Sequence, residues 1–211
     1  MVSLGSIIDF VLHFDKYLSV VLQEYGLLTY GVLFLIIFLE TGLVFAPFLP
    51  GDSLLFAAGA FAAQGAMSSI ALFILLSIAA VTGDTVNYWV GHKYGKKILH
   101  EKLKVLKKEH IEKTERFYER YGKKTIIIAR FVPVVRTFAP FVAGIGRMNY
   151  GQFFVYNVIG GVSWVALFVF LGYFFGNLGV VKENFGLAVI FIIIVSFIPV
   201  FYEYIRHKRT I

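Results

Sequence analysis

Long uncharged stretches are the strongest constraint on how this chain can fold. Residues 53–83 and residues 148–181 contain no Asp, Glu, Lys or Arg. About 20 apolar residues are enough for a helix to cross the hydrocarbon core of a bilayer, so each stretch can hold a complete span. Charged residues make up 16% of the chain, against about 25% in average soluble domains. The sequence therefore predicts an all-α, polytopic membrane protein.

The first half of the chain predicts a helical hairpin followed by a full span. Residues 29–61 are expected to form two half-helices with a tip at residues 47–52, because proline and glycine there interrupt a helix. Small and polar residues at 62–69 mark the next break. A complete transmembrane helix is then expected over residues 67–92.

The second half repeats this plan with different residues. Residues 125–146 are apolar apart from Arg130 and Arg136 and are interrupted by prolines, which predicts a second hairpin over about 125–147. Full spans are expected near residues 153–175 and over residues 185–202. With about three full spans, the two re-entrant hairpins would enter from opposite faces of the membrane. Such paired, inverted broken segments are the sequence pattern of a transporter site. The residues expected to shape the hairpin tips are Pro47, Pro50, Gly51, Pro133, Pro140 and Gly144.

Basic residues predict how the chain is oriented. The 20 Lys and Arg residues outnumber the 13 Asp and Glu residues, and most of the excess lies in a loop over residues 93–124 and a tail over residues 206–211. Basic loops beside apolar spans mark the cytoplasmic side. Residues 101–121 are expected to form a solvated helix facing anionic lipid, and no nucleic-acid partner is predicted. Residues 1–26 predict an amphipathic helix lying in the membrane interface.

Several kinds of chemistry are not predicted for this chain. It contains no cysteine, which excludes disulfides, thiol catalysis and thiolate metal ligands. Its five histidines are scattered, and neither a metal-ligand cluster nor a phosphate-binding glycine loop occurs. We therefore expect no metal, no cofactor and no enzymatic activity. The sequence leaves homo-oligomerisation open.

Two arginines in the second hairpin, Arg130 and Arg136, are the candidate substrate-binding residues. An arginine at the centre of a membrane helix costs about 2.5–3.5 kcal/mol on insertion scales, so each needs an anionic partner. Arginine keeps its charge when buried and presents a planar fork that fits phosphate. Together with backbone N–H groups expected to be freed by Pro133 and Pro140, they predict an anion site for a phosphate group. The alternative is that they only form structural pairs with Glu40 and Asp52.

Acidic residues in apolar surroundings are the candidate proton carriers. Glu40 and Asp52 are expected to couple transport to protons, because intramembrane carboxyl groups often relay protons. Asp52 could equally cap the half-helix that follows it. Asp84 and Tyr88 are secondary candidates. Tyr88, Asn157 and Trp164 are expected to pack between helices rather than touch a substrate.

Four segments of the chain resemble motifs of the DedA family, whose membrane domain is also called the SNARE-associated or VTT domain. They are "ETGLVFAPFLPGD" from Glu40, "GDTVNYWVG" from Gly83, "ARFVPVVRTFAPFVAG" from Ala129 and "NVIGGVSW" from Asn157. The family domain is expected over residues 27–205. The resemblance implies a lipid transporter of the cytoplasmic membrane, and dependence on proton motive force is implied for several members. Bacterial members are associated with returning undecaprenyl phosphate to the cytoplasmic leaflet.

The sequence thus predicts a proton-coupled flippase for a phosphate-headed lipid, with undecaprenyl phosphate as the expected substrate. The predicted partners are this lipid, protons and the bilayer. Three alternatives stay open: an energy-independent phospholipid scramblase, a small-ion or proton exchanger, and a membrane scaffold whose charge pairs are structural.

Overall fold

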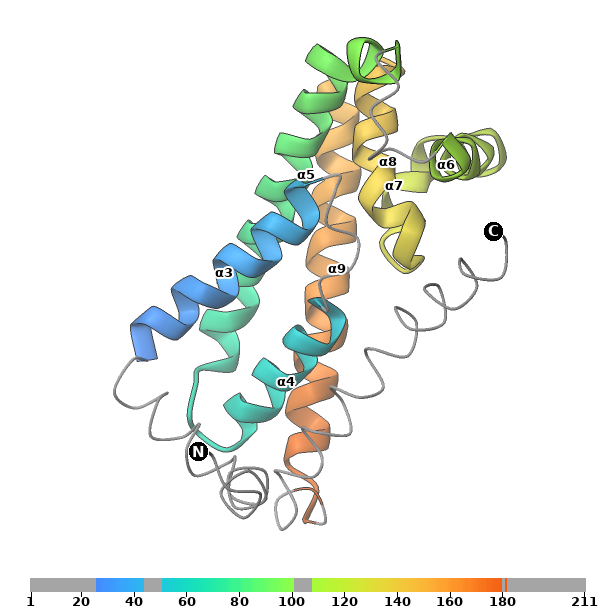
Figure 1. Ribbon diagram of the computed structural model, residues 1–211. Helices are drawn as coiled ribbons and strands as arrows, with labels where there is room; N and C mark the ends of the chain where they lie inside the picture. The colour runs from blue at the N-terminus through green and yellow to red at the C-terminus, as the bar shows by residue number, and fades with distance from the viewer. Residues whose placement is uncertain (1–25, 44–50, 101–107, 180, 182–211) are drawn as a thin grey trace, which may run out of the picture. The chain divides into compact units, whose positions relative to one another are not determined.

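The computed structural model describes residues 26–43, 51–100, 108–179 and 181. All regular structure in these residues is helical (Figure 1). The elements are α3 (Gly26–Gly42), α4 (Gly51–Ala63), α5 (Ser69–His100), α6 (Lys108–Tyr121), a 3-10 turn η1 (Gly122–Lys124), α7 (Thr125–Ala129), α8 (Pro133–Ile145) and α9 (Tyr150–Gly176). The N-terminal helix, the first hairpin tip with Pro47 and Pro50, the span over 185–202 and the basic tail were predicted for residues outside those described.

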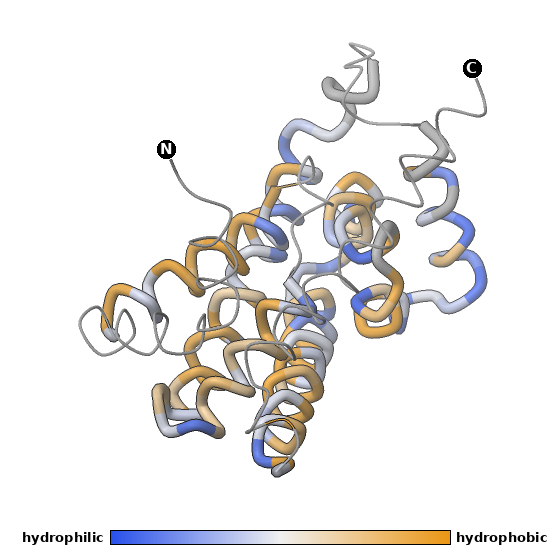
Figure 2. Tube along the Cα trace, turned by 60° about the horizontal axis from the view of Figure 1, so that its bottom comes forward, coloured by the Kyte–Doolittle hydropathy of each residue, from blue (hydrophilic) through white to orange (hydrophobic). Residues whose placement is uncertain are grey.

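Two helices are long and apolar enough to cross a membrane. They are Ser69–Gly95 within α5 and Tyr150–Gly176, which is α9. Figure 2 shows apolar residues along α5 and α9, whereas α6 is largely polar. These helices confirm the spans predicted over 67–92 and 153–175. The described residues do not test the third span, nor whether the hairpins are re-entrant.

Burial in these helices is inverted relative to a soluble protein. Ile70, Ile74 and Ile78 follow one face of α5 and are half or more exposed. The polar side chains of Asp84 and Asn87 on the same helix are buried instead. Exposed apolar stripes and buried polar groups are expected when the surrounding solvent is lipid.

The described residues divide into two compact units, and the first contains α4 and the last third of α9. Glycines let these two helices approach closely. A Cβ added at Gly172 would collide with the carbonyl group of Phe56, and one at Gly59 with the carbonyl group of Val169. The Gln64 side chain donates to the carbonyl of Gly176 at 3.1 Å. Small residues at such contacts are typical of helix pairs in membranes.

The second unit comprises residues 33–43, 73–100 and 108–166 among those described. Its core gathers side chains from α5, α7, α8 and α9: Tyr88, Ile126, Ala129, Val135, Ala139, Ala143 and Phe153. The amphipathic α6 packs on α8, where the Tyr118 hydroxyl donates to the carbonyl of Ala139 at 2.9 Å. Glu115, Arg116, Glu119 and Arg120 on its other face are exposed.

The basic segment 93–124, predicted as a loop, is helical wherever it is described. Residues 93–100 continue α5, and residues 108–124 form α6 and η1. A helix is therefore present over 108–121, within the range 101–121 where a solvated helix was expected. Its apolar side chains share one face, so it gains stability by burying that face against α8.

The second broken segment has its break between α7 and α8. Pro133 is the first residue of α8, where the missing N–H costs nothing and the first-turn N–H groups lack helical partners. Pro140 lies inside α8. It removes the N–H that would bond the Arg136 carbonyl within the helix, so it takes away a donor and frees none. The expectation that Pro140 frees N–H groups is therefore wrong.

Candidate functional site

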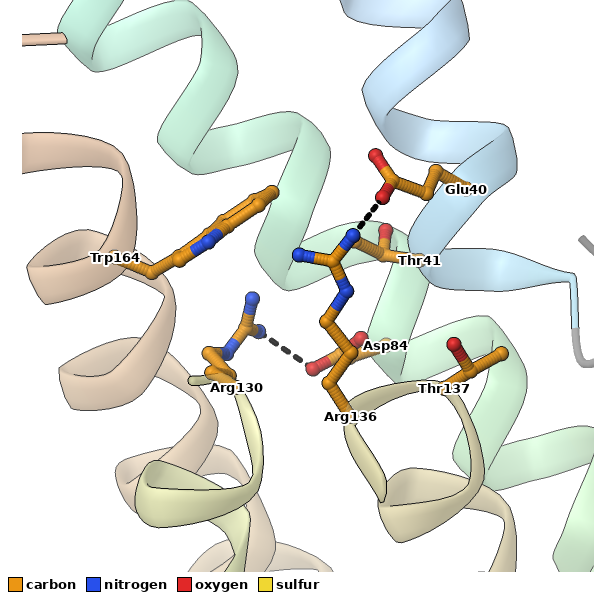
Figure 3. Close-up of a pocket in the computed structure, with 7 residues that line it drawn as sticks. All are labelled: Glu40, Thr41, Asp84, Arg130, Arg136, Thr137 and Trp164. Atoms are coloured by element: carbon orange, nitrogen blue, oxygen red, sulfur yellow. Dashed lines mark hydrogen bonds and ion pairs between the residues drawn. The ribbon is translucent and has the colours of Figure 1, made fainter. Parts of the chain in front are cut away.

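A small cavity in the second unit is lined by residues of four helices and of the α7–α8 break, four of them charged (Figure 3). Its volume of about 10 Å³ is about enough to hold one water molecule. The residues that line it are Glu40 and Thr41 of α3, Asp84 of α5, Arg130 between α7 and α8, Arg136 and Thr137 of α8, and Trp164 of α9.

Arg136 forms the first ion pair of the cavity with Glu40. Its Nη2 donates to Oε1 of Glu40, although the two residues are 96 positions apart. The Glu40 side chain is 2% exposed and that of Arg136 is 14% exposed. Arg136 is the fourth residue of α8 and Glu40 lies near the end of α3. The pair therefore joins the end of one apolar helix to the start of another.

Arg130 forms the second ion pair, with Asp84. Its Nη2 lies 2.5 Å from Oδ2 of Asp84 and 2.5 Å from Oδ1 of Asn157. The Asn157 amide is oriented in turn, because its Nδ2 donates to the Val81 carbonyl at 3.0 Å. α5 and α9 thus hold one guanidinium group between a carboxylate and an amide oxygen.

Two glycines of α9 make room for the Arg130 side chain. A Cβ added at Gly160 would lie 3.2 Å from Cδ of Arg130, and one added at Gly161 would lie 3.2 Å from its Nη2. Both distances are tighter than ordinary contacts, so larger residues there would press on the arginine. Gly160 and Gly161 therefore help to shape the site.

Trp164 lies against both guanidinium groups. The centre of its ring is 5.3 Å from Cζ of Arg136 and 6.0 Å from Cζ of Arg130, within the range of cation–π attraction. The ring is 1% exposed. The N–H donors of the two guanidinium groups bond the carboxylates of Asp84 and Glu40 and, for Arg130, the amide oxygen of Asn157.

Asn87 ties together the backbone beside the Arg136–Glu40 pair. Its Nδ2 donates to the carbonyl of Thr41 at 3.1 Å and to the carbonyl of Thr137 at 2.8 Å. Thr41 follows Glu40 and Thr137 follows Arg136. Asn87 is fully buried, so this one amide fixes the spacing of α3, α5 and α8 at the ion pair.

The four charges of the cavity sum to zero. Arg130 and Arg136 contribute two positive charges, and Glu40 and Asp84 contribute two negative charges. No other charged side chain lines the cavity among the residues that the structure describes. Mutual neutralisation is what allows four ionised groups to stay buried together.

The structure brings together four of the predicted site residues: Glu40, Asp84, Arg130 and Arg136. Asp84, predicted as secondary, is a direct partner of Arg130. Asp52 lies in the first turn of α4, after Gly51, in the other unit. Its acidic side chain is favourable at that helix start, and its part in the site stays a prediction.

Tyr88 and Gly144 have structural positions beside the cavity rather than in its lining. The Tyr88 ring stacks on Phe153 with 4.4 Å between centres, and its hydroxyl donates to the Met148 carbonyl at 2.5 Å. Tyr88 therefore packs between helices, as expected from the sequence when this role was set against substrate contact. A Cβ at Gly144 would collide with the Tyr88 carbonyl, so Gly144 allows α8 to approach α5.

Sequence reasoning missed the site roles of Asn87, Asn157 and Trp164. Asn157 and Trp164 were expected to be packing residues, yet one bonds Arg130 and the other covers both arginines. A signal existed in the helical spacing. Asn87 follows Asp84 by three residues and Trp164 follows Asn157 by seven, which places each pair on one helix face.

Comparison with known proteins identifies the family. The VTT domain matches residues 49–174. Protein DedA of Escherichia coli K12 is 51% identical over 207 residues, which cover 97% of this chain and 94% of that protein. This chain belongs to the DedA family. The resemblance inferred from the sequence motifs is thereby confirmed.

Further DedA relatives are named as membrane proteins. Inner membrane protein YqjA of E. coli K12 is 37% identical over 149 residues, covering 70% of this chain and 68% of that protein. The uncharacterized membrane protein Rv0364 of Mycobacterium tuberculosis is 39% identical over 184 residues, covering 85% and 80%. No solved structure matches the chain. As a DedA-family member it is a membrane protein, and the family implies a transporter-like role.

Proposed function

We propose that this DedA-family protein moves a phosphate-headed lipid, in the first instance undecaprenyl phosphate, between the leaflets of the cytoplasmic membrane, in a cycle coupled to protons. One observation carries the proposal. Two guanidinium groups that keep their charge lie buried among apolar helices, and each is paired with a carboxylate. Groups of this kind inside a membrane mark ion and substrate paths.

The chemistry of the site suits a phosphate head. Arginine edges present parallel N–H donors that match two oxygens of a phosphate or a carboxylate. Arg130 and Arg136 both contact the Trp164 ring, so one head group could bind the edges of both. The hydrocarbon tail would stay in the lipid, against the exposed apolar faces of the helices.

The size of the cavity requires a second conformation. A volume of about 10 Å³ does not hold a phosphate head group, and the N–H donors are bonded to protein carboxylates. Binding therefore requires both ion pairs to open while the phosphate takes the place of the carboxylates. We propose that this exchange underlies alternating access, with the broken α7–α8 segment as the moving part.

The carboxyl groups that the phosphate displaces are the proposed proton carriers. Glu40 would lose its ion pair with Arg136 when that arginine turns to the phosphate, and a buried carboxylate that loses a compensating charge is costly. Protonation would remove that cost. Asp52 is the second proton carrier proposed from the sequence. The basic segment and the C-terminus are proposed to lie in the cytoplasm.

The test is transport by the purified full chain in liposomes, with a fluorescent polyprenyl phosphate as the probe. Arg136→Lys keeps the positive charge but loses the planar set of guanidinium N–H donors. We expect the rate of lipid transport to be at least tenfold lower. That factor corresponds to about 1.5–3 kcal/mol for hydrogen bonds to a charged group. Arg147→Lys, at an exposed arginine that does not line the cavity, is the control and should stay within twofold.

Each alternative gives a different result. An unchanged rate in Arg136→Lys would refute the phosphate-binding role and favour structural charge pairs in a scaffold. Lipid transport that ignores a pH gradient would indicate a scramblase. Ion current in liposomes without the phosphate lipid would indicate an exchanger.

A further inference from the structure

The balance of charge in the cavity limits what can cross the membrane with the lipid. Glu40, Asp84, Arg130 and Arg136 sum to zero, and their side chains are between 2% and 14% exposed. Buried charges that are not compensated cost several kcal/mol each. An anionic head group that entered this cavity alone would add its whole charge to a site that is already neutral.

We infer that the site takes up one proton for each negative charge of the head group, on Glu40 and Asp84, so that lipid transport is electroneutral. This inference rests on the proposed function and makes it more specific. It places the second proton on Asp84, the partner of Arg130, rather than on Asp52.

The exchange balances atom by atom. When a phosphate oxygen accepts from Arg136, Oε1 of Glu40 loses its donor and takes a proton. When another accepts from Arg130, Oδ2 of Asp84 does the same. A phosphodiester with one negative charge needs one of these steps. A phosphomonoester, which carries nearly two charges above pH 6, needs both.

Other groups that face the carboxyl groups of Glu40 and Asp84 do not change the number of protons taken up with each lipid. Asn157 from α9 and Thr41 from α3 are uncharged. Tyr118 from α6 stays neutral, because burial, reinforced by the charge of Asp84, raises the pKa of Tyr118 above its usual value. Trp164 contributes only a ring face. Within the described residues, Glu40 and Asp84 are the acidic groups that line the cavity.

The experiment measures the steady distribution of two labelled lipids between the leaflets of proteoliposomes. The probes are phosphatidylglycerol and phosphatidic acid with a dye on one acyl chain, a diester and a monoester. Dithionite destroys the dye in the outer leaflet only. A pH difference is imposed while valinomycin and potassium set the membrane potential, and protein-free liposomes give the blank.

With the wild-type chain, the ratio of the diester between the two leaflets should change about tenfold per pH unit. The ratio of the monoester should change about a hundredfold, since each proton contributes one factor of ten. The potential should have no effect. If one uncompensated charge crossed, 100 mV would change the distribution by about fiftyfold. A potential dependence of that size in the wild-type chain would overturn the inference.

Asp84→Asn keeps an acceptor for Arg130 but cannot take a proton. The empty cavity of this variant carries a net charge of +1, so each lipid needs one proton fewer. The leaflet ratio of both lipids should therefore lose one factor of ten per pH unit and gain the potential dependence of one charge. Glu40→Gln should do the same, which protects the test if one variant fails to fold. If Asp52→Asn lowered the pH response and these two did not, the proton site would be elsewhere and the inference wrong. If the wild-type chain moved neither lipid nor a polyprenyl phosphate, the proposed function itself would fail.

Discussion

At the scale of single residues, Trp164 is the clearest addition that the structure makes to the site. Its ring contacts both arginines and is almost fully buried. A desolvated cation–π contact is worth about 2 kcal/mol. The ring therefore holds two like charges close together in the positions that a phosphate would bridge.

Replacing Trp164 should weaken head-group binding more than it slows turnover. We expect Trp164→Leu to raise the KM for the labelled lipid about tenfold, because the guanidinium groups lose the ring that positions them. Trp164→Phe, which keeps a weaker π face, should raise it two- to threefold. The measurement is initial transport rate against lipid concentration in liposomes. Trp89→Leu, at the exposed tryptophan, is the matched control; an equal rise in its KM would contradict the assignment.

The individual charges could be found from the sequence, but their pairing could not. Arg130, Arg136 and Glu40 are conspicuous because they interrupt apolar runs, and the Arg136–Glu40 pair was one of the stated alternatives. The Arg130–Asp84 contact joins residues 46 positions apart. It depends on how α5 lies against the α7–α8 break, which helical periodicity does not determine.

At the scale of helices, Asn87 connects the elements that carry the charges. Its amide bonds backbone carbonyls of α3 and α8 from a position on α5. The two carbonyls belong to Thr41 and Thr137, which directly follow the charged residues Glu40 and Arg136 in the sequence. Asn87 is therefore a positioning residue, which acts through the Arg136–Glu40 pair without touching a substrate.

Asn87→Leu should lower the rate of turnover while leaving lipid binding nearly unchanged. Leucine is similar in size but donates no hydrogen bond, so two carbonyl groups lose their donor, at about 1–3 kcal/mol each. We expect kcat to fall at least tenfold, KM to stay within threefold and the melting temperature to drop. Asn87→Ser, with one donor, should recover part of kcat.

The control for Asn87 is Asn177→Leu. Asn177 is exposed and donates to the Tyr173 carbonyl at 3.0 Å, so its loss tests the effect of removing one surface amide. If Asn87→Leu raised KM as strongly as it lowered kcat, the residue would affect binding directly and the positioning role would be refuted.

The long helices were the most predictable elements. α5 and α9 follow from uncharged runs of sufficient length, and their starts agree with the predicted spans to within three residues. The helical structure of the basic segment was harder to predict, because its many charged residues make the helical spacing of its apolar residues difficult to recognise. The apolar face of α6 becomes evident only when α8 is present to cover it, through contacts such as Tyr118 to Ala139.

At the scale of the whole molecule, the orientation in the membrane can be tested with introduced cysteines, because the chain has none of its own. The apolar part of α5 spans 27 residues, which is about 40 Å at the helical rise. A bilayer core is about 30 Å thick. The two ends of this helix should therefore lie on opposite sides.

Ser68→Cys and Lys93→Cys place single thiols at exposed positions near the two ends of the apolar part of α5. A membrane-impermeant maleimide added to intact cells should label Ser68→Cys alone. Inverted membrane vesicles should show labelling at Lys93→Cys alone, since basic residues stay in the cytoplasm. Labelling of both from the same side would show that α5 does not cross the membrane.

The burial of Trp164 has a practical consequence for experiments on this protein. The chain contains two tryptophans, and the other, Trp89, is 48% exposed. With Trp89 replaced by phenylalanine, the remaining indole would sit at the centre of the charged cluster. Its ultraviolet fluorescence would then change whenever water enters that cluster. The protein would thus supply its own optical probe of conformational change.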